Sequence, residues 1–132
     1  LGRNNNDIYN FIDKKDFMIN DSNLIYKKNK NINLTYLTVH KSKGLESVNV
    51  IIINLINDTL GFPSMIKKEK ILRLLNNNKE SIIYSEERRL FYVALTRTKN
   101  KVYLLTPNKN ESIFVKELIN CYKDKIKIVK IN

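Results

Sequence analysis

The sequence predicts an α/β fold, because short runs of β-branched residues alternate with segments of helical periodicity. The densest run, residues 48–54, reads V-N-V-I-I-I-N. β-branched residues on both faces are typical of a strand covered on both sides, as in a parallel sheet. The elements follow the order strand, strand, helices, strand, helix, strand. With 132 residues, 42% of them hydrophobic, the chain is long enough for one such domain and too short for two.

The first 31 residues show weaker patterns than the rest of the chain. Ile8, Phe11 and Ile12 fall at the spacing i, i+3, i+4, which predicts a short helix with one apolar face. Residues 20–31 are polar and rich in lysine, so we expect a loop or a poorly ordered link there.

Two strands are predicted in the centre of the chain, over residues 34–39 and 48–54. Parallel neighbours are normally joined by a crossover of a dozen residues or more, and only about eight residues separate these two runs. Spacing alone therefore leaves a hairpin open as the alternative to a parallel pair.

The next segment begins with the turn G-F-P-S at residues 61–64, whose serine can cap a helix over residues 65–75. A second helix is expected to begin between Ser81 and Ser85 and to run to about Thr98. Ser85 would be a suitable N-cap, because it places two glutamates in the first turn, where the helix dipole favours negative charge.

In the last part of the chain, the sequence pattern predicts a strand, a helix and a second strand. Residues 101–106 read K-V-Y-L-L-T, and Pro107 ends that strand. Residues 111–122 have apolar side chains in step with a helix. Residues 125–131 alternate apolar residues with lysine, which is typical of an exposed edge strand.

The composition limits the class of protein. A formal net charge of +11 and a pI near 9.7 favour a polyanion partner, although lysines from an AT-biased coding sequence would also produce this charge and simply be solvated. Cys121 is the single cysteine, so an internal disulfide and a multi-cysteine zinc cluster are excluded and a reducing compartment is allowed. No apolar run approaches the roughly 18 residues of a membrane span, so we expect a soluble protein.

Arg97 ends an apolar helical stripe formed by Leu90, Val93 and Ala94. An unpaired charge on the buried side of a helix costs several kcal/mol, so this guanidinium requires either an acidic side chain of the same domain or a bound phosphate. Arg88 and Arg89 stand beside Glu86 and Glu87, and local ion pairs explain them adequately.

The connection T-V-H-K-S-K-G-L-E at residues 38–46 has too few apolar side chains to belong to a core. Its chemistry-bearing residues are His40, Lys41, Lys43, Gly44 and Glu46. A glycine between lysines can hold a phosphate through backbone N–H groups and ammonium charge, and the glutamate can accept hydrogen bonds from ribose hydroxyls. His40 follows the end of a predicted strand, where functional groups of open α/β sheets usually lie.

Several catalytic patterns are missing from the sequence. It has no G-x-x-x-x-G-K-[ST] phosphate loop and no Asp-Glu pair after an apolar strand to hold magnesium, so the chain cannot by itself assemble a site for nucleotide hydrolysis. The sequence also shows no recognisable Ser-His-Asp set around its one histidine, and no cluster of acids and histidines with metal-ligand spacing.

Two stretches together resemble a known family. Y-L-T-V-H-K-S-K-G-L-E at residues 36–46 and E-E-R-R-L-F-Y-V-A-L-T-R-T-K at residues 86–99 are similar to motifs V and VI of superfamily 1 DNA helicases of the UvrD/Rep/PcrA type. Both motifs are long, correctly ordered and correctly spaced.

The resemblance implies a partial RecA-like lobe of the P-loop NTPase type, the second of the motor, with a mostly parallel sheet flanked by helices. Residues 1–31 would be the exit segment from an accessory subdomain, partly disordered, and residues 32–132 the C-terminal part of the lobe. The strands flanking the loop would then be parallel. The implied activity is ATP-dependent unwinding of DNA with 3′-to-5′ polarity.

The resemblance also implies roles for particular residues. Arg97 would reach the γ-phosphate of ATP, Glu46 would bind the ribose, and Lys43 and Gly44 would lie beside the nucleotide. The residues implied to contact single-stranded DNA are Thr38 and His40.

The implied partners are single-stranded and duplex DNA and the first RecA-like lobe of the same protein, which would hold the Mg²⁺ that accompanies ATP. The alternatives are a component of a helicase-nuclease that contains the same lobe, and a non-catalytic basic module that only binds nucleic acid. The expected location is a reducing intracellular compartment that contains DNA: the nucleus or an organelle in a eukaryote, or the cytoplasm in a bacterium.

Overall fold

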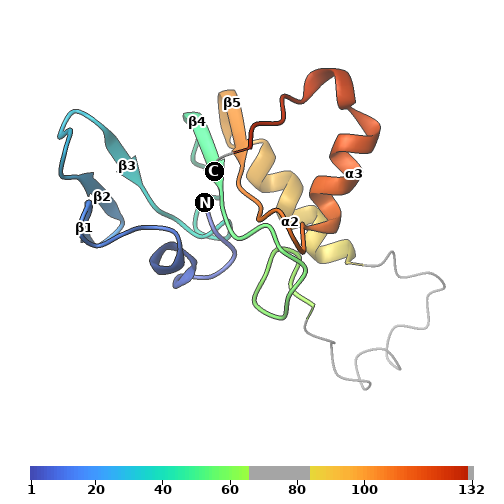
Figure 1. Ribbon diagram of the computed structural model, residues 1–132, viewed down its shortest axis with the longest axis horizontal. Coiled ribbons are helices and arrows are strands. Elements are labelled where there is room, and N and C mark those ends of the chain that lie inside the picture. Colours follow the sequence, from blue (N-terminus) through green and yellow to red (C-terminus); the bar gives the residue numbers. More distant parts are fainter. Residues whose placement is uncertain (66–83, 131–132) are drawn as a thin grey trace.

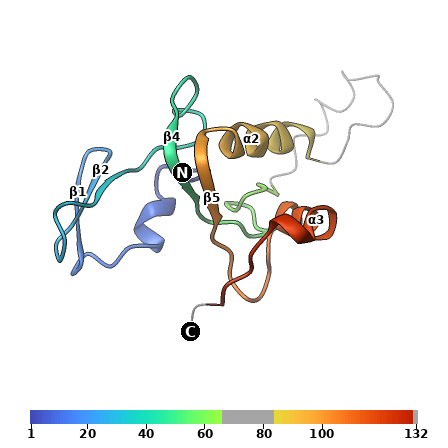
Figure 2. The ribbon, with the colours of Figure 1, turned by 90° about the horizontal axis from the view of Figure 1, so that it is seen from above.

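The computed structural model describes residues 1–65 and 84–130 and confirms the α/β prediction (Figure 1). A pair of parallel strands lies between a small antiparallel sheet and two helices, as both views of the ribbon show (Figures 1 and 2). The elements are η1 (Asp7–Asn10), β1 (Phe17–Asn20), β2 (Asn23–Tyr26), β3 (Asn33–Thr35), β4 (Ser47–Ile52), α2 (Ser85–Leu95), β5 (Thr98–Leu104), α3 (Ile113–Cys121) and η2 (Lys123–Lys125).

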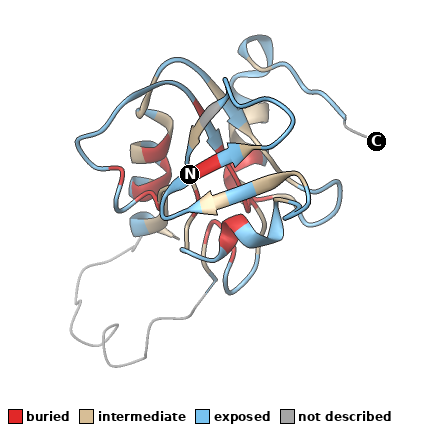
Figure 3. Ribbon diagram, turned by 90° about the vertical axis from the view of Figure 1, so that its left-hand side faces the viewer, coloured by how far each residue is buried: buried red, intermediate tan, exposed pale blue. Residues whose placement is uncertain are grey.

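The parallel pair β4–β5 carries the main core. Val50 and Ile52 of β4 are buried in one cluster with residues of α2 and α3. Figure 3 shows the buried segments, in red, gathered in the interior of the ribbon. Phe62 and Phe114 complete this core with Phe91, whose ring lies 5.5 Å from that of Phe62 and 5.2 Å from that of Phe114. Aromatic contacts of this kind add about 0.5–1.5 kcal/mol each to the burial of apolar area.

The prediction that this strand is covered on both faces holds only near its carboxyl end. Ile53, which follows β4, packs with Ile8 and Leu24 in a second cluster on the side of the antiparallel sheet. Val48, near the amino end, is 60% exposed, and Ile51, which points to the face opposite Val50 and Ile52, is still 42% exposed. The run of apolar residues alone could not predict which positions of the strand are buried, because burial depends on which other elements pack over each position.

The N-terminal third is more ordered than its composition predicted. The polar stretch 20–31 contains strand β2, which pairs antiparallel with β1 and β3. Leu24 is buried in the second cluster, and this packing outweighs the polar residues around it. The helix predicted around Ile8 is the short 3₁₀ turn η1, in which Ile8 is buried, and Phe11, which follows the turn, is 43% exposed.

The strand predicted over residues 34–39 is also different. β3 ends at Thr35 and pairs with β2, so it forms neither the parallel pair nor the hairpin considered with the following strand. Residues 37–39 instead lie beside the N-terminus, where the Gly2 N–H donates to Leu37 O at 3.2 Å and the Val39 N–H donates to Gly2 O at 3.0 Å.

The C-terminal half follows the prediction with shifted boundaries. Helix α2 begins at Ser85, so the N-cap position belongs to Tyr84, and Ser85 does not cap the helix. β5 begins at Thr98, because its first residues pair with Ser47 and Asn49 of β4. Helix α3 is capped by Ser112, whose hydroxyl accepts a hydrogen bond from the Phe114 N–H at 3.3 Å.

Two further predictions concern the remaining segments. The helix predicted over residues 65–75 lies, apart from Met65, outside the described residues. The edge strand predicted over residues 125–131 is absent from its described part, residues 125–130, where the 3₁₀ turn η2 ends and an irregular backbone follows.

Candidate functional site

Arg97 lies just beyond the C-terminal end of α2, where backbone carbonyls lack helical partners and favour a cation. Its Nε donates to Val93 O at 3.1 Å and its Nη2 to Thr96 Oγ1 at 3.3 Å. The third hydrogen bond leaves the helix, because Nη1 donates to Leu45 O at 3.2 Å. The arginine therefore joins the end of the helix to the loop that precedes β4.

No carboxylate lies within ion-pair distance of Arg97 among residues 1–65 and 84–130. Within that part of the chain, the internal salt bridge considered as an alternative is not formed. A guanidinium carries five N–H groups, and the three hydrogen bonds leave one N–H on each terminal nitrogen available. The guanidinium can therefore bind an anion through these two N–H groups and keep its present hydrogen bonds.

The loop of residues 38–46 begins with a fixed turn. The Lys41 N–H donates to Thr38 Oγ1 at 3.3 Å, and the Ser42 N–H donates to Thr38 O at 3.1 Å. The buried Ser42 hydroxyl donates to Val39 O at 2.8 Å. Because these contacts hold the turn, the exposed side chains of His40 and Lys41 project from a rigid base.

The second half of the loop contains the residues expected to meet the nucleotide. Lys43, Gly44 and Glu46 are all exposed. Gly44 has a φ of 79°, in the left-handed region that side chains rarely adopt, which explains the glycine at this position. The Glu46 carboxylate pairs with Lys99 Nζ at 3.3 Å, and both side chains are more than half exposed.

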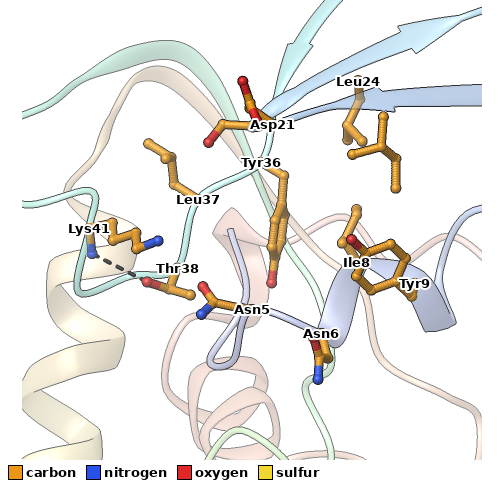
Figure 4. A pocket seen from close by; sticks show the side chains of 12 residues that line it. Asn5, Asn6, Ile8, Tyr9, Asp21, Leu24, Tyr36, Leu37, Thr38 and Lys41 are labelled. Atoms are coloured by element: carbon orange, nitrogen blue, oxygen red, sulfur yellow. Dashed lines mark hydrogen bonds between the residues drawn. The ribbon is translucent and has the colours of Figure 1, made fainter.

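Backbone hydrogen bonds tie this half of the loop to the arginine. The Ser47 N–H donates to Arg97 O at 2.9 Å, and Leu45 O accepts from the guanidinium. Arg97 and Glu46 are thus adjacent, with Lys43 and Gly44 beside them on the same loop. Thr38 and His40 lie at the other end of that loop, and Thr38 lines a separate cleft (Figure 4).

These groups lie at the amino ends of the parallel strands, not at a carboxyl end as the position of His40 suggested. The reason is that the segment before His40 does not belong to the β4–β5 sheet. The loop leads into β4, and Arg97 leads into β5.

The charged residues of α2 also differ from expectation. Among residues 1–65 and 84–130, Glu87 binds Arg3 with Nη2–Oε1 at 2.9 Å, and Arg88 binds Glu117 with Nη2–Oε1 at 2.7 Å, so both reach other elements of the fold. The Arg88 guanidinium also lies 5.2 Å from the centre of the Phe114 ring. Its hydrogen bond and charge lower the pKa of the Glu117 carboxyl below its usual value.

Sequence reasoning missed Lys99 and Thr96 as neighbours of the site. Lys99 pairs with Glu46 only because strands β4 and β5 are parallel and in this register. The Thr96 hydroxyl accepts a hydrogen bond from the Arg97 side chain. Its position directly before Arg97 was the only feature of the sequence that could have indicated this contact.

Comparison with known proteins identifies relatives of the chain. Residues 3–109 match the family model of the UvrD-like helicase C-terminal domain. DNA helicase IV of Escherichia coli (strain K12) is 37% identical over 89 residues, which cover 67% of this chain and 13% of that protein. An ATP-dependent helicase/nuclease subunit of Clostridium botulinum (strain Kyoto / Type A2) is 29% identical over 143 aligned positions, covering 90% of this chain and 11% of that protein.

The corresponding helicase/nuclease protein of Streptococcus pneumoniae is 31% identical over 115 positions, covering 61% of this chain and 10% of that protein. The chain thus spans only about a tenth to an eighth of the length of these relatives. No solved structure matches it. In the described ranges, no helix is both long enough and apolar enough to cross a membrane. Because the family model covers most of the sequence, the chain belongs to the family of UvrD-like helicase C-terminal domains.

Proposed function

We propose that this chain is part of the second motor lobe of an ATP-dependent DNA helicase that unwinds DNA with 3′-to-5′ polarity. The observation that carries the proposal is the contact between Arg97 and Leu45. It holds a guanidinium, which pairs with no carboxylate in the described residues, beside the exposed carboxylate of Glu46. A hydrogen-bond donor for phosphate at the end of α2 and an acceptor for ribose on the adjoining loop suit a nucleotide presented by another lobe.

Arg97 would donate its remaining N–H groups to the γ-phosphate of ATP. Charge develops on the equatorial oxygens of the transferred phosphoryl group, and a positioned guanidinium stabilises it. The ammonium of Lys43 and the backbone at Gly44 would lie beside the nucleotide. ATP enters this scheme as the substrate, and its Mg²⁺ would be held by the first lobe of the same protein.

Glu46 would accept hydrogen bonds from the ribose hydroxyls. To do so, its carboxylate has to share or leave the contact with Lys99 at 3.3 Å. Exposed ion pairs of this kind contribute about 0–1 kcal/mol, so the exchange costs little.

Single-stranded DNA would contact Thr38 and His40, at the start of the same loop. The hydrogen bonds that fix residues 38–42 favour movement of this turn as one unit. Closure of the lobes on ATP would therefore shift the DNA contacts together with Glu46, and hydrolysis would release them.

The test is Arg97→Ala in the full-length protein. We expect kcat for DNA-stimulated ATP hydrolysis to fall by at least roughly 10²-fold, on the scale of a lost arginine finger, with little change in affinity for single-stranded DNA. Arg89→Ala is the matched control, because Arg89 is an exposed arginine of α2 and should leave turnover unchanged. Near-normal turnover of the Arg97 variant would discredit the assignment.

A second candidate is the same lobe within a helicase-nuclease. It is favoured by the similarity to the Clostridium botulinum helicase/nuclease protein over 90% of the chain. Both candidates require the same residues of this chain, so a nuclease assay on the full-length protein distinguishes them. ATP hydrolysis by this lobe together with its first lobe excludes a module that only binds nucleic acid.

A further inference from the structure

A cleft of about 330 Å³, with Thr38 in its lining, lies between the N-terminal segment and the β1–β2 hairpin. Figure 4 shows Thr38 and Asn5 on one side of the Tyr36 ring, and Ile8 and Tyr9 on the other. This volume is at the lower end of the range for small-molecule sites, roughly 300–1,000 Å³. It is large enough for one nucleotide unit and too small for a folded partner.

The lining combines three kinds of group. Buried Ile8 and Leu24 contribute apolar surface, and Tyr9, which is 53% exposed, contributes an aromatic ring. Asn5 offers an amide that can donate and accept hydrogen bonds. Lys41 adds a positive charge at the end near Thr38. A ring to stack on, amide groups and a nearby ammonium are the features with which proteins hold a base and its phosphate.

The walls of the cleft are already fixed. The Tyr36 hydroxyl donates to Asn4 O at 2.5 Å. Buried Asp7 accepts from the backbone N–H groups of Arg3 at 2.7 Å and Asn4 at 2.8 Å, and from Asn54 Nδ2 at 3.1 Å. The N-terminal segment is therefore held in place by a buried carboxylate, and the cleft needs little reorganisation to accept a ligand.

We propose that this cleft binds one nucleotide of single-stranded DNA, with the base against Tyr9 and the adjacent phosphate at Lys41. The proposal rests on the proposed function, since it continues the DNA path from Thr38. Asp21 also lines the cleft. Its carboxylate repels a phosphate, so it disfavours a phosphate at the β1–β2 turn and leaves Lys41 as the cation that receives it.

The experiment varies both partners: the full-length protein is compared with its single-residue variants, and an intact oligonucleotide is compared with oligonucleotides that lack one base. Binding of a short single-stranded oligonucleotide is measured by fluorescence anisotropy, with an abasic site moved through each position. For the unmodified protein, affinity should fall by about 5- to 150-fold when the base is removed at one position, as expected for one stacked base. In Tyr9→Ala that penalty should disappear, whereas Tyr9→Phe should retain it.

Lys41→Ala should reduce the slope of log affinity against log salt by about 0.7, the value for one phosphate contact on a single strand. The controls are Tyr122→Ala and Lys116→Ala, which remove exposed side chains of the α3 region far along the chain from the cleft. Both should keep the abasic penalty and the salt slope of the unmodified protein.

The proposal is overturned if Tyr9→Ala keeps the full abasic penalty, or if no position shows one. These results are separate from the test of the motor. Loss of turnover in Arg97→Ala together with an unchanged abasic penalty in Tyr9→Ala would remove the cleft proposal alone. Normal turnover in Arg97→Ala would remove the motor assignment, while the abasic comparison would still report whether a base occupies the cleft.

Discussion

At the scale of single residues, Arg97 is held by acceptors that carry no formal charge. Two are backbone carbonyls, of Val93 and Leu45, and the third is the Thr96 hydroxyl. These contacts orient the guanidinium without neutralising it. An arginine paired with a carboxylate would gain stability in the free lobe and lose attraction for a phosphate, so this arrangement favours ligand binding over stability.

The two turn glycines, Gly44 and Gly61, should respond differently to replacement by alanine. Gly44 has space around it but a φ of 79°, so alanine should cost about 1–2 kcal/mol through backbone strain alone. At Gly61 the added methyl group would collide with the carbonyl oxygen of Ile56 and come within 3.0 Å of the Asp58 nitrogen. Backbone atoms cannot yield easily, so we expect a loss of about 3 kcal/mol or more.

Thermal unfolding of the two glycine variants checks this order. Gly44→Asn is the control, because asparagine tolerates the left-handed region better than alanine and should recover part of the loss. An equal loss at both glycines would contradict the distinction between backbone strain and steric collision.

At the scale of elements, helix α2 is attached to the rest of the fold by its charged residues as well as by its apolar face. Glu87 accepts from Arg3 of the N-terminal segment and from the Ser64 N–H at 3.2 Å. Arg88 reaches Glu117 of α3. Helix α2, which Arg97 follows two residues after its end, is therefore held from three directions, and this limits the positions that the arginine can adopt.

The Arg88–Glu117 pair predicts a pH dependence of the α2–α3 packing. The folded pKa of Glu117 is lowered from its usual value of 4.5, mainly by the hydrogen bond from Arg88. A lowered carboxyl pKa contributes stability that is present above about pH 4.5 and is lost as the pH falls through the folded value. The side chains are 36% and 41% exposed, so solvent screening keeps the contribution small.

Melting temperatures between pH 6 and pH 3 test this prediction. The unmodified protein should lose stability more steeply below pH 4.5 than Glu117→Gln, which lacks the ionised carboxyl throughout. Parallel pH profiles for the two proteins would show that the pair contributes nothing to stability.

At the scale of the whole molecule, the chain contains one half of the proposed nucleotide site. The arginine, the glutamate and the glycine lie at the amino ends of β4 and β5, and the sequence has no phosphate loop. The net charge of +11 adds a long-range attraction for nucleic acid that salt screens.

The isolated chain should therefore show no ATP hydrolysis and only weak, salt-sensitive binding to single-stranded DNA. Steady-state ATPase assays at saturating DNA, and anisotropy at about 50 and 200 mM salt, measure both properties. Addition of the first lobe serves as the control, because it should restore turnover. Robust hydrolysis by the chain alone would overturn the assignment of a half-site.

Much of the fold could be predicted because it depends on local pattern. The apolar run around Val50 formed a strand, and the two segments with helical periodicity that contain Leu90 and Leu118 formed helices α2 and α3. Errors arose where long-range packing decided the outcome. Strand β2 formed in a polar stretch because Leu24 meets Ile8 and Ile53, and no local pattern contains that contact.

The sequence by itself determined the fold class, the family and the chemical groups available on the loop and at the end of α2, because these follow from residue type and spacing along the chain. Only the tertiary structure decided which groups meet. Arg97 contacts Leu45, Glu46 contacts Lys99 and Arg88 contacts Glu117 because the parallel pairing of β4 with β5, and the packing of α2 on α3, bring distant segments together. Such contacts are set by packing and register over the whole core, which residue order alone does not specify.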